Sequence, residues 1–111
     1  MMETNTGIKV RQAEGSEGIM MFFCPGCGFY HAVFTKDEGY PHERWNFNGD
    51  VRRPTFRPSV HVSRPGLVCH SFITDGKIEF LSDCTHEMRN RIVDLPDINA
   101  LHGEEDNHQP A

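Results

Sequence analysis

Four cysteines constrain the fold of this chain more strongly than any other feature of its sequence. Two of them form the knuckle Cys24-Pro25-Gly26-Cys27, and a two-residue spacer lets both thiolates of a tight turn reach one metal ion. Cys69 and Cys84 can complete the tetrahedral set of ligands that zinc prefers. A chain of 111 residues has a small core and gains much stability from such a site. The spacing therefore predicts a structural zinc ion bound by Cys24, Cys27, Cys69 and Cys84.

Other interpretations of the cysteines stay open. His86 and then His31 are alternate ligands, because each lies close in sequence to a cysteine. If only three residues bind, the open fourth position could make the zinc catalytic. A redox motif is disfavoured, because such motifs begin a helix in a strand–helix–strand unit and this knuckle joins two β-rich runs. Four buried free cysteines without metal are the remaining alternative.

Composition and charge narrow the class of protein. The net charge of −5 argues against nonspecific nucleic-acid binding, which needs a basic surface. No apolar run approaches the ~20 residues that cross a bilayer, and the first residues lack the pattern of a signal peptide. We expect a cytoplasmic protein whose reduced thiols favour metal over disulfides. Residues 1–102 are expected to form one domain, and residues 103–111 a disordered acidic tail.

The pattern along the chain predicts a mostly β, small α+β domain built from hairpins, zinc-ribbon-like, with one short helical turn. Alternating or apolar runs predict strands over residues 8–12, 19–23, 29–35, 59–63, 67–74, 77–82 and 92–95. The knuckle would cap the hairpin between the second and third of these. Two prolines keep residues 53–58 out of a central strand. The helical turn is expected over residues 83–89, with Asn90 in the left-handed closing position.

The hairpin around Asp75-Gly76 gives the sharpest structural prediction. A two-residue type I′ turn there puts Thr74 opposite Lys77, and by continuation His70 opposite Leu81. Because side chains alternate along a strand, Cys69 and Cys84 would share the metal face. His70 and Asp83 would share the opposite face.

A histidine oriented by a carboxylate is half of a nucleophilic triad. Ser71 and Ser82 would point to the wrong face, whereas Ser59 begins a strand directly after Pro58 and is the best-placed nucleophile. Asn48-Gly49 or the backbone near Ser59 could supply oxyanion donors. From the residues alone, a structural hydrogen bond between His70 and Asp83 beside the zinc is the favoured interpretation.

Several motifs together resemble a known family. The runs CPGCGFYH, WNFNGD, PTFRPSV, CHSFITDGKIEFLSDCTH and VDLP, between Phe22 and Asp97, are similar to small phage and prophage proteins of unknown function, often mislabelled ammonia monooxygenase. Related domains occur beside bacterial ubiquitin-like conjugation genes, and the resemblance to them implies a serine peptidase. It also implies that the knuckle binds metal and that Ser59, His70 and either Asp83 or His86 are active. The family's Ala-Leu-Ala-Gly turn is replaced here by residues 87–90.

Together these observations predict a small serine hydrolase of the Ser59-His70-Asp83 type with a structural zinc. Its substrate would be a protein or peptide with an extended tail, such as that of a ubiquitin-like protein, which suits an exposed strand edge. The alternative is a non-catalytic zinc-ribbon-like module with which a phage binds a host protein. Neither nucleic acid nor membrane is an expected partner.

Overall fold

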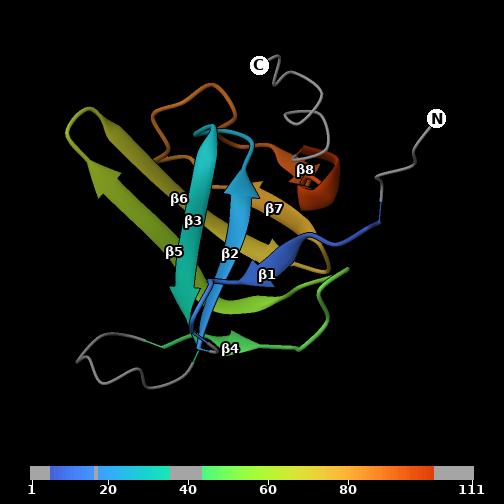
Figure 1. The fold of residues 1–111 in the computed structure, drawn as a ribbon. Helices are drawn as coiled ribbons and strands as arrows, with labels where there is room; N and C mark the ends of the chain where they lie inside the picture. Colours follow the sequence, from blue (N-terminus) through green and yellow to red (C-terminus); the bar gives the residue numbers. More distant parts are fainter. Residues whose placement is uncertain (1–5, 17, 36–43, 102–111) are drawn as a thin grey trace, which may run out of the picture.

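The computed structural model describes residues 6–16, 18–35 and 44–101. Within these residues, eight strands form two antiparallel sheets (Figure 1). The smaller sheet has the order β1-β2-β3 and the larger the order β4-β5-β6-β7-β8. The strands are β1 (Val10–Gln12), β2 (Ile19–Cys24), β3 (Phe29–Phe34), β4 (Asn46–Phe47), β5 (Phe56–Arg64), β6 (Leu67–Thr74), β7 (Lys77–Phe80) and β8 (Ile92–Asp94). The mostly β prediction is confirmed.

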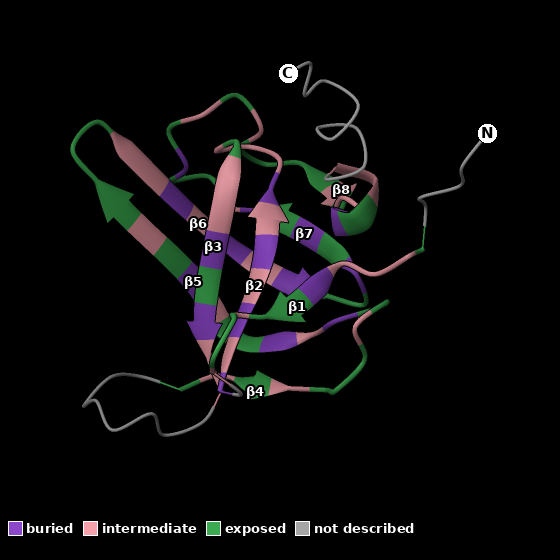
Figure 2. Cartoon of the chain, viewed as in Figure 1, coloured by how far each residue is buried: buried purple, intermediate pink, exposed green. Residues whose placement is uncertain are grey.

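The cysteine knuckle joins β2 to β3. Cys24 pairs with Phe29 at the end of the ladder, and Gly28 N donates to Cys24 O across the turn at 2.8 Å. Side chains of β2 alternate between buried and partly exposed (Figure 2), as a strand with one covered face requires. The knuckle therefore caps a hairpin, as the sequence predicts.

The hairpin of β6 and β7 has the predicted register. Thr74 pairs with Lys77 and Ser71 with Phe80, and Asp75 and Gly76 both have positive φ angles, 51° and 83°, as a type I′ turn needs. The expected strand to residue 82 is too long by two residues. β7 ends at Phe80 because the chain turns after Leu81, where Cys84 N donates to Leu81 O.

Strand β5 begins at Phe56 rather than at the expected Ser59, and it includes Pro58. The ladder to β6 shifts register between Phe56 and Val60. Pro58 lies within this irregular stretch, where no regular ladder hydrogen bond requires the N–H that proline lacks. On the other side, β4 pairs only with Phe56 and Arg57. The prediction that two prolines keep residues 53–58 out of a central strand is therefore wrong for residues 56–58, which belong to β5 between β4 and β6.

The core lies between the two sheets. Phe22 of β2 and Phe56 of β5 are both buried and stack with ring centroids 6.4 Å apart, which joins the sheets by aromatic packing. Three of the four cysteines are buried in this layer. The cluster consists of Val10, Met20, Phe22, Cys24, Val33, Phe56, Val60, Cys69, Ile73, Ile78, Phe80, Cys84 and Leu95.

The predicted helical turn over residues 83–89 is wrong in its position. These residues form turns, because Thr85 N donates to Val68 O and Asn90 N to Phe80 O, which ties the backbone to the sheet. Asn90 has the expected left-handed conformation, with φ 66°. The helical turn instead covers residues 98–101.

The domain boundary at residue 102 and the acidic tail 103–111 lie outside the described residues. In the part of the chain that the structure describes, no helix is long and apolar enough to cross a membrane.

Asp97 joins the N-terminal segment to the helical turn over residues 98–101. Its Oδ1 accepts from Asn99 N at 2.9 Å and from Ala100 N at 3.0 Å, and its Oδ2 accepts from Gly7 N. Burial raises the pKa of Asp97, but the backbone N–H groups of Ala100, Gly7 and Asn99 outweigh burial and leave the pKa lowered. The carboxylate form is therefore the stabilising one.

We expect Asp97→Ala to lower the free energy of unfolding by about 1–2 kcal/mol at neutral pH, because a helix cap is lost. A lowered pKa gives stability that is complete above the ordinary aspartate pKa of ~4 and is lost as the pH falls through the folded-state value. Urea unfolding from pH 7 down to pH 2 should show wild type and variant converging below about pH 4. A pH-independent difference would contradict this account.

Candidate active site and metal centre

Ser59, His70 and Asp83 form a hydrogen-bonded chain. Ser59 Oγ lies 2.9 Å from His70 Nε2, and His70 Nδ1 lies 3.0 Å from Asp83 Oδ2. One serine, one imidazole and one carboxylate in this order match the arrangement of nucleophile, base and orienting group in hydrolytic triads. The three side chains come from β5, β6 and the turn after β7.

The register of β5 and β6 brings Ser59 to His70. His61 pairs directly with His70, and Ser59, two residues earlier, projects from the same face of the sheet. The Arg57–Pro58 peptide bond just before Ser59 is cis. The indole Nε1 of Trp45 donates to Ser59 O at 3.2 Å, which fixes the backbone that carries the hydroxyl.

The backbone of His70 is held on its β7 side by two residues. Leu81 N donates to His70 O at 2.9 Å. Cys84 Sγ accepts from His70 N and donates to His70 O, both at 3.3 Å. The imidazole therefore projects from a segment whose peptide groups are both engaged, which limits how the ring can move relative to Ser59.

Asp83 reaches His70 from a turn rather than from a continued strand. The turn is fixed by Cys84 N to Leu81 O and by Thr85 N to Val68 O at 2.9 Å. The side chain of Asp83 is 54% exposed, against 28% for His70. Solvent therefore screens the attraction between this carboxylate and an imidazolium, and orientation of the ring is the larger part of what Asp83 can contribute.

Sequence reasoning missed His61 as a neighbour of this site. Its ring centroid lies 5.0 Å from that of His70, and its side chain is exposed. The Pro65-Gly66 turn, which pairs Arg64 with Leu67, was the signal that could have placed it. Asn48, in contrast, is engaged elsewhere: its Nδ2 donates to Arg53 O and its Oδ1 accepts from two backbone N–H groups.

A group of metal-ligating atoms lies on the opposite, inner face of β6. One ligand atom from each of Cys24, Cys27, His31 and Cys69 lies within 4.8 Å of the others. The sulfurs of Cys24 and Cys69 are 3.8 Å apart, about the separation of two thiolates bound to one tetrahedral zinc with Zn–S distances of ~2.3 Å. His31 is 3% exposed, and its Nε2 is buried without a hydrogen-bond partner among the described residues. This donor set is compatible with zinc.

The structure does not bring Cys84 into the group with Cys24 and Cys27. Cys84 belongs to a second group with Cys69 and His86, and its sulfur is bound to the backbone of His70. The four-cysteine set of the sequence prediction is thus divided between two overlapping groups that share Cys69.

His86 contacts Cys69 in a way that suits a hydrogen-bond donor. Its Nε2 lies 3.4 Å from Cys69 Sγ, and its Nδ1 accepts from Met88 N at 3.2 Å. Because Met88 N–H is a donor, Nδ1 carries no proton, and in the neutral ring the proton is on Nε2. In this arrangement His86 Nε2 donates to the sulfur of Cys69.

The thiols of the first group compete for protons. The hydrogen bond from Cys69 lowers the pKa of Cys24 to about 4. The hydrogen bond to Cys24, together with burial, raises the pKa of Cys69. Burial and then the negative charge of Cys24 raise the pKa of Cys27 to about 11. One thiolate is therefore stable here without a cation, and a divalent ion would favour ionisation of the others.

Gly26 makes room for the ring of His86. A Cβ atom on Gly26 would lie 2.4 Å from His86 Cε1 and 2.6 Å from its Nε2. The ring cannot shift freely, because both of its nitrogens are engaged. The knuckle thus requires glycine at this position for close packing.

We expect Gly26→Ala to lower the free energy of unfolding by about 1–3 kcal/mol through overpacking. The measurement is thermal or urea unfolding of four proteins: wild type, Gly26→Ala, His86→Ala and the double variant. In the His86→Ala background, Gly26→Ala should lower the free energy of unfolding much less, because the ring that the new Cβ would contact is absent. An equal cost in both backgrounds would show that another contact is responsible.

Most of the chain matches a known protein family. A family model described as "Bacterial ubiquitination-like system serine protease (BubE)" matches residues 2–81. The matched segment covers β1 to β7 and includes Ser59 and His70, while Asp83 lies two residues beyond its end. Searches of curated proteins and of solved structures found no match.

Proposed function

The chain belongs to the BubE family, the serine proteases of bacterial ubiquitination-like systems, and from this we propose that it is a peptidase with Ser59 as nucleophile. The observation that carries the proposal is the hydrogen-bonded chain from Ser59 through His70 to Asp83. The family name supports a serine protease in general, and the geometry supports these three residues as its triad.

In the proposed reaction Ser59 Oγ attacks the carbonyl carbon of the scissile bond, and its proton passes to His70 Nε2 at the observed 2.9 Å contact. The tetrahedral intermediate collapses, and His70 gives this proton to the leaving amine. Water then attacks the acyl-enzyme with His70 as base again, which releases the acid and restores Ser59. Asp83 accepts from Nδ1–H throughout and keeps Nε2 directed at the serine.

We further propose that zinc bound by Cys24, Cys27, His31 and Cys69 has a structural role. Four ligands close the coordination sphere and leave no position for water or substrate. Cys69 and His70 are consecutive residues of one strand, so their side chains lie on opposite faces of the sheet. The metal would hold the two sheets together on the inner face, and the chemistry would take place on the outer face.

For the substrate we propose an extended peptide, such as the C-terminal tail of a ubiquitin-like protein. The family name refers to bacterial ubiquitination-like systems, which favours a ubiquitin-like protein as the source of the peptide. The exposure of the site supports this class of substrate: the side chains of His70 and Asp83 are 28% and 54% exposed, so a peptide can reach them from solvent.

A fluorophosphonate probe tests the proposal directly. The folded protein should form one covalent adduct, located on Ser59 by peptide mass spectrometry, and His70→Ala should prevent it. The adduct requires an activated serine, which a surface serine does not provide. A folded wild-type protein that forms no adduct would refute the peptidase and favour a binding module.

A further inference from the structure

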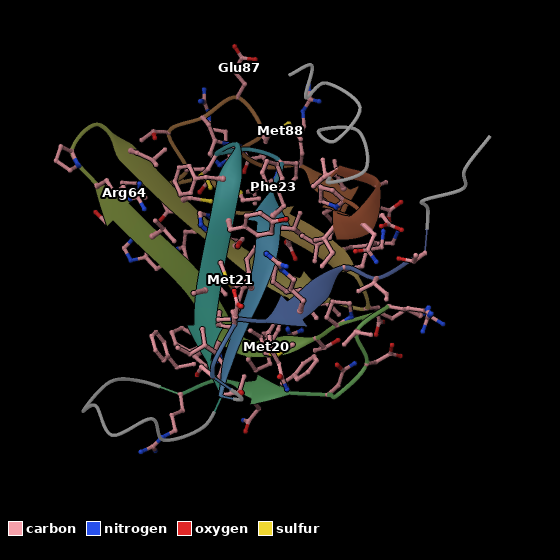
Figure 3. All side chains as sticks on the ribbon, in the orientation of Figure 1. Met20, Met21, Phe23, Arg64, Glu87 and Met88 are labelled. Carbon is pink, nitrogen blue, oxygen red and sulfur yellow. The ribbon has the colours of Figure 1, made fainter. Side chains whose placement is uncertain are left out.

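The outer edge of β5 next to Ser59 is open. The sheet order places β5 beside β6 on one side, and on the other side β4 covers only Phe56 and Arg57. From His61 to Arg64, no strand in the described part of the chain pairs with this side (Figure 1). Figure 3 shows Arg64 at the far end of this edge, near the tip of the β5–β6 hairpin.

The register shows which backbone groups face the open side. Val68 O and His70 O accept from residues on the β7 side of β6. Because the direction of the backbone groups alternates along a strand, the N–H and C=O groups of Cys69 and Ser71 point the other way, toward β5. Their partners Val62 and Val60 therefore use their N–H and C=O groups within the sheet.

It follows that the N–H and C=O groups of His61 and Ser63 point outward. Both residues are exposed, and within the described residues no hydrogen bond engages their outward backbone groups. An unpaired edge of this kind is a template for another extended chain. The indole Nε1 of Trp45 donates to Ser59 O, so the part of the edge with unpaired backbone groups ends at Ser59.

We propose that the peptide substrate binds as an added antiparallel strand on this edge, through the backbone groups of His61 and Ser63. The inference rests on the proposed function of Ser59. An antiparallel strand runs from Ser63 toward Ser59, so the residues before the scissile bond would pair with the edge and the scissile carbonyl would arrive at Ser59 Oγ. If the residue at the scissile bond lies opposite Ser59, the residues two and four positions upstream pair with His61 and Ser63.

Because recognition is through the main chain, the substrate class is an extended segment with free N–H groups at these two alternate positions. Its sequence would matter less than its ability to adopt β structure. Side chains of His61 and Ser63 lie on the outer face, where they can contact alternate side chains of the bound peptide.

Two active-site probes test whether a peptide pairs with this edge. One is a five-alanine peptide with an acetyl group at its N-terminus and a diphenyl phosphonate in place of its carboxyl group. The other carries a single alanine before the same phosphonate. We expect the long probe to modify Ser59 at least about 10-fold faster, because each backbone hydrogen bond contributes modestly and several form together. Counted from the alanine that carries the phosphonate, N-methylation of the alanine two or four positions upstream should remove most of this gain in rate. N-methylation of the alanine one or three positions upstream should not.

A proline variant tests the same edge from the protein side. Ser63→Pro removes an outward N–H that the sheet does not use, so it should lower the rate of the long probe toward that of the short one. The rate of the short probe should not change. The matched control is Ile92→Pro on β8, because Ile92 is exposed and its N–H also faces outward from the opposite edge. It should alter neither rate.

The outcomes separate the two proposals. Equal rates for both probes, or N-methyl effects without alternation, would overturn edge binding while the adduct on Ser59 still supports the peptidase. If neither probe modifies the folded protein, the peptidase proposal fails, and edge binding of a substrate fails with it. Faster reaction of the long probe with the alternating pattern supports both.

Discussion

Replacing Ser59 by alanine is expected to lower kcat/KM for peptide hydrolysis by about 10³-fold or more, because the proposed nucleophile is lost and no acyl-enzyme can form. His70→Ala should have an effect of similar size, since Ser59 Oγ would lose the group 2.9 Å away that takes its proton. The double variant should be no slower than either single variant, because the two residues act as one unit.

Asp83→Asn should lower kcat/KM by a smaller factor, about 10- to 100-fold, because the side chain of Asp83 is 54% exposed and its charge is screened. Hydrolysis of a fluorogenic peptide that the wild type cleaves measures all four variants. Ser82→Ala is the matched control, as an exposed serine next to Asp83, and it should keep wild-type activity. Retention of activity by Ser59→Ala would exclude the mechanism.

Removal of metal is expected to unfold the domain. Structural zinc sites in small domains contribute on the order of 10 kcal/mol to folding, which exceeds the stability of most domains of this size. The purified protein should contain one zinc per chain, and a chelator in excess should abolish the cooperative thermal transition. A chelated protein that keeps its fold would show that the zinc is not structural.

Two cysteine variants identify the ligand set. Cys27→Ser should lose the zinc, because Cys27 belongs to the group of four mutually close ligands. Cys84→Ser should retain one zinc per chain, because its sulfur is bound to the backbone of His70 instead. Loss of zinc from Cys84→Ser as complete as from Cys27→Ser would instead favour the four-cysteine site that the sequence predicts.

The hairpin of β6 and β7 was predictable because its determinants are local. Asp75-Gly76 fixes the turn type, and the turn fixes which residue faces which for several pairs on either side. The separation of Cys69 from His70 onto opposite faces follows from the same local rule. Ser59 could be singled out because it follows Pro58 at the start of an alternating run.

The remaining features depend on contacts between distant residues. Asp83 reaches His70 through a turn that is docked on Val68, and no local pattern encodes that docking. His31 joins the knuckle only because β2 and β3 place it opposite the buried Phe22. The irregular ladder at the start of β5 likewise arises from pairing with β6, which the prolines alone do not specify.

The order Cys69-His70 also limits how this protein can change. Inserting or deleting one residue within β6 would exchange its two faces. The imidazole would then enter the apolar layer between the sheets, and the thiol would face solvent beside Ser59. A one-residue register shift of this strand would therefore disrupt the candidate metal centre and the candidate triad at once. The two can vary independently only through substitutions, so length variation is expected in the turns that flank β6 and not within it.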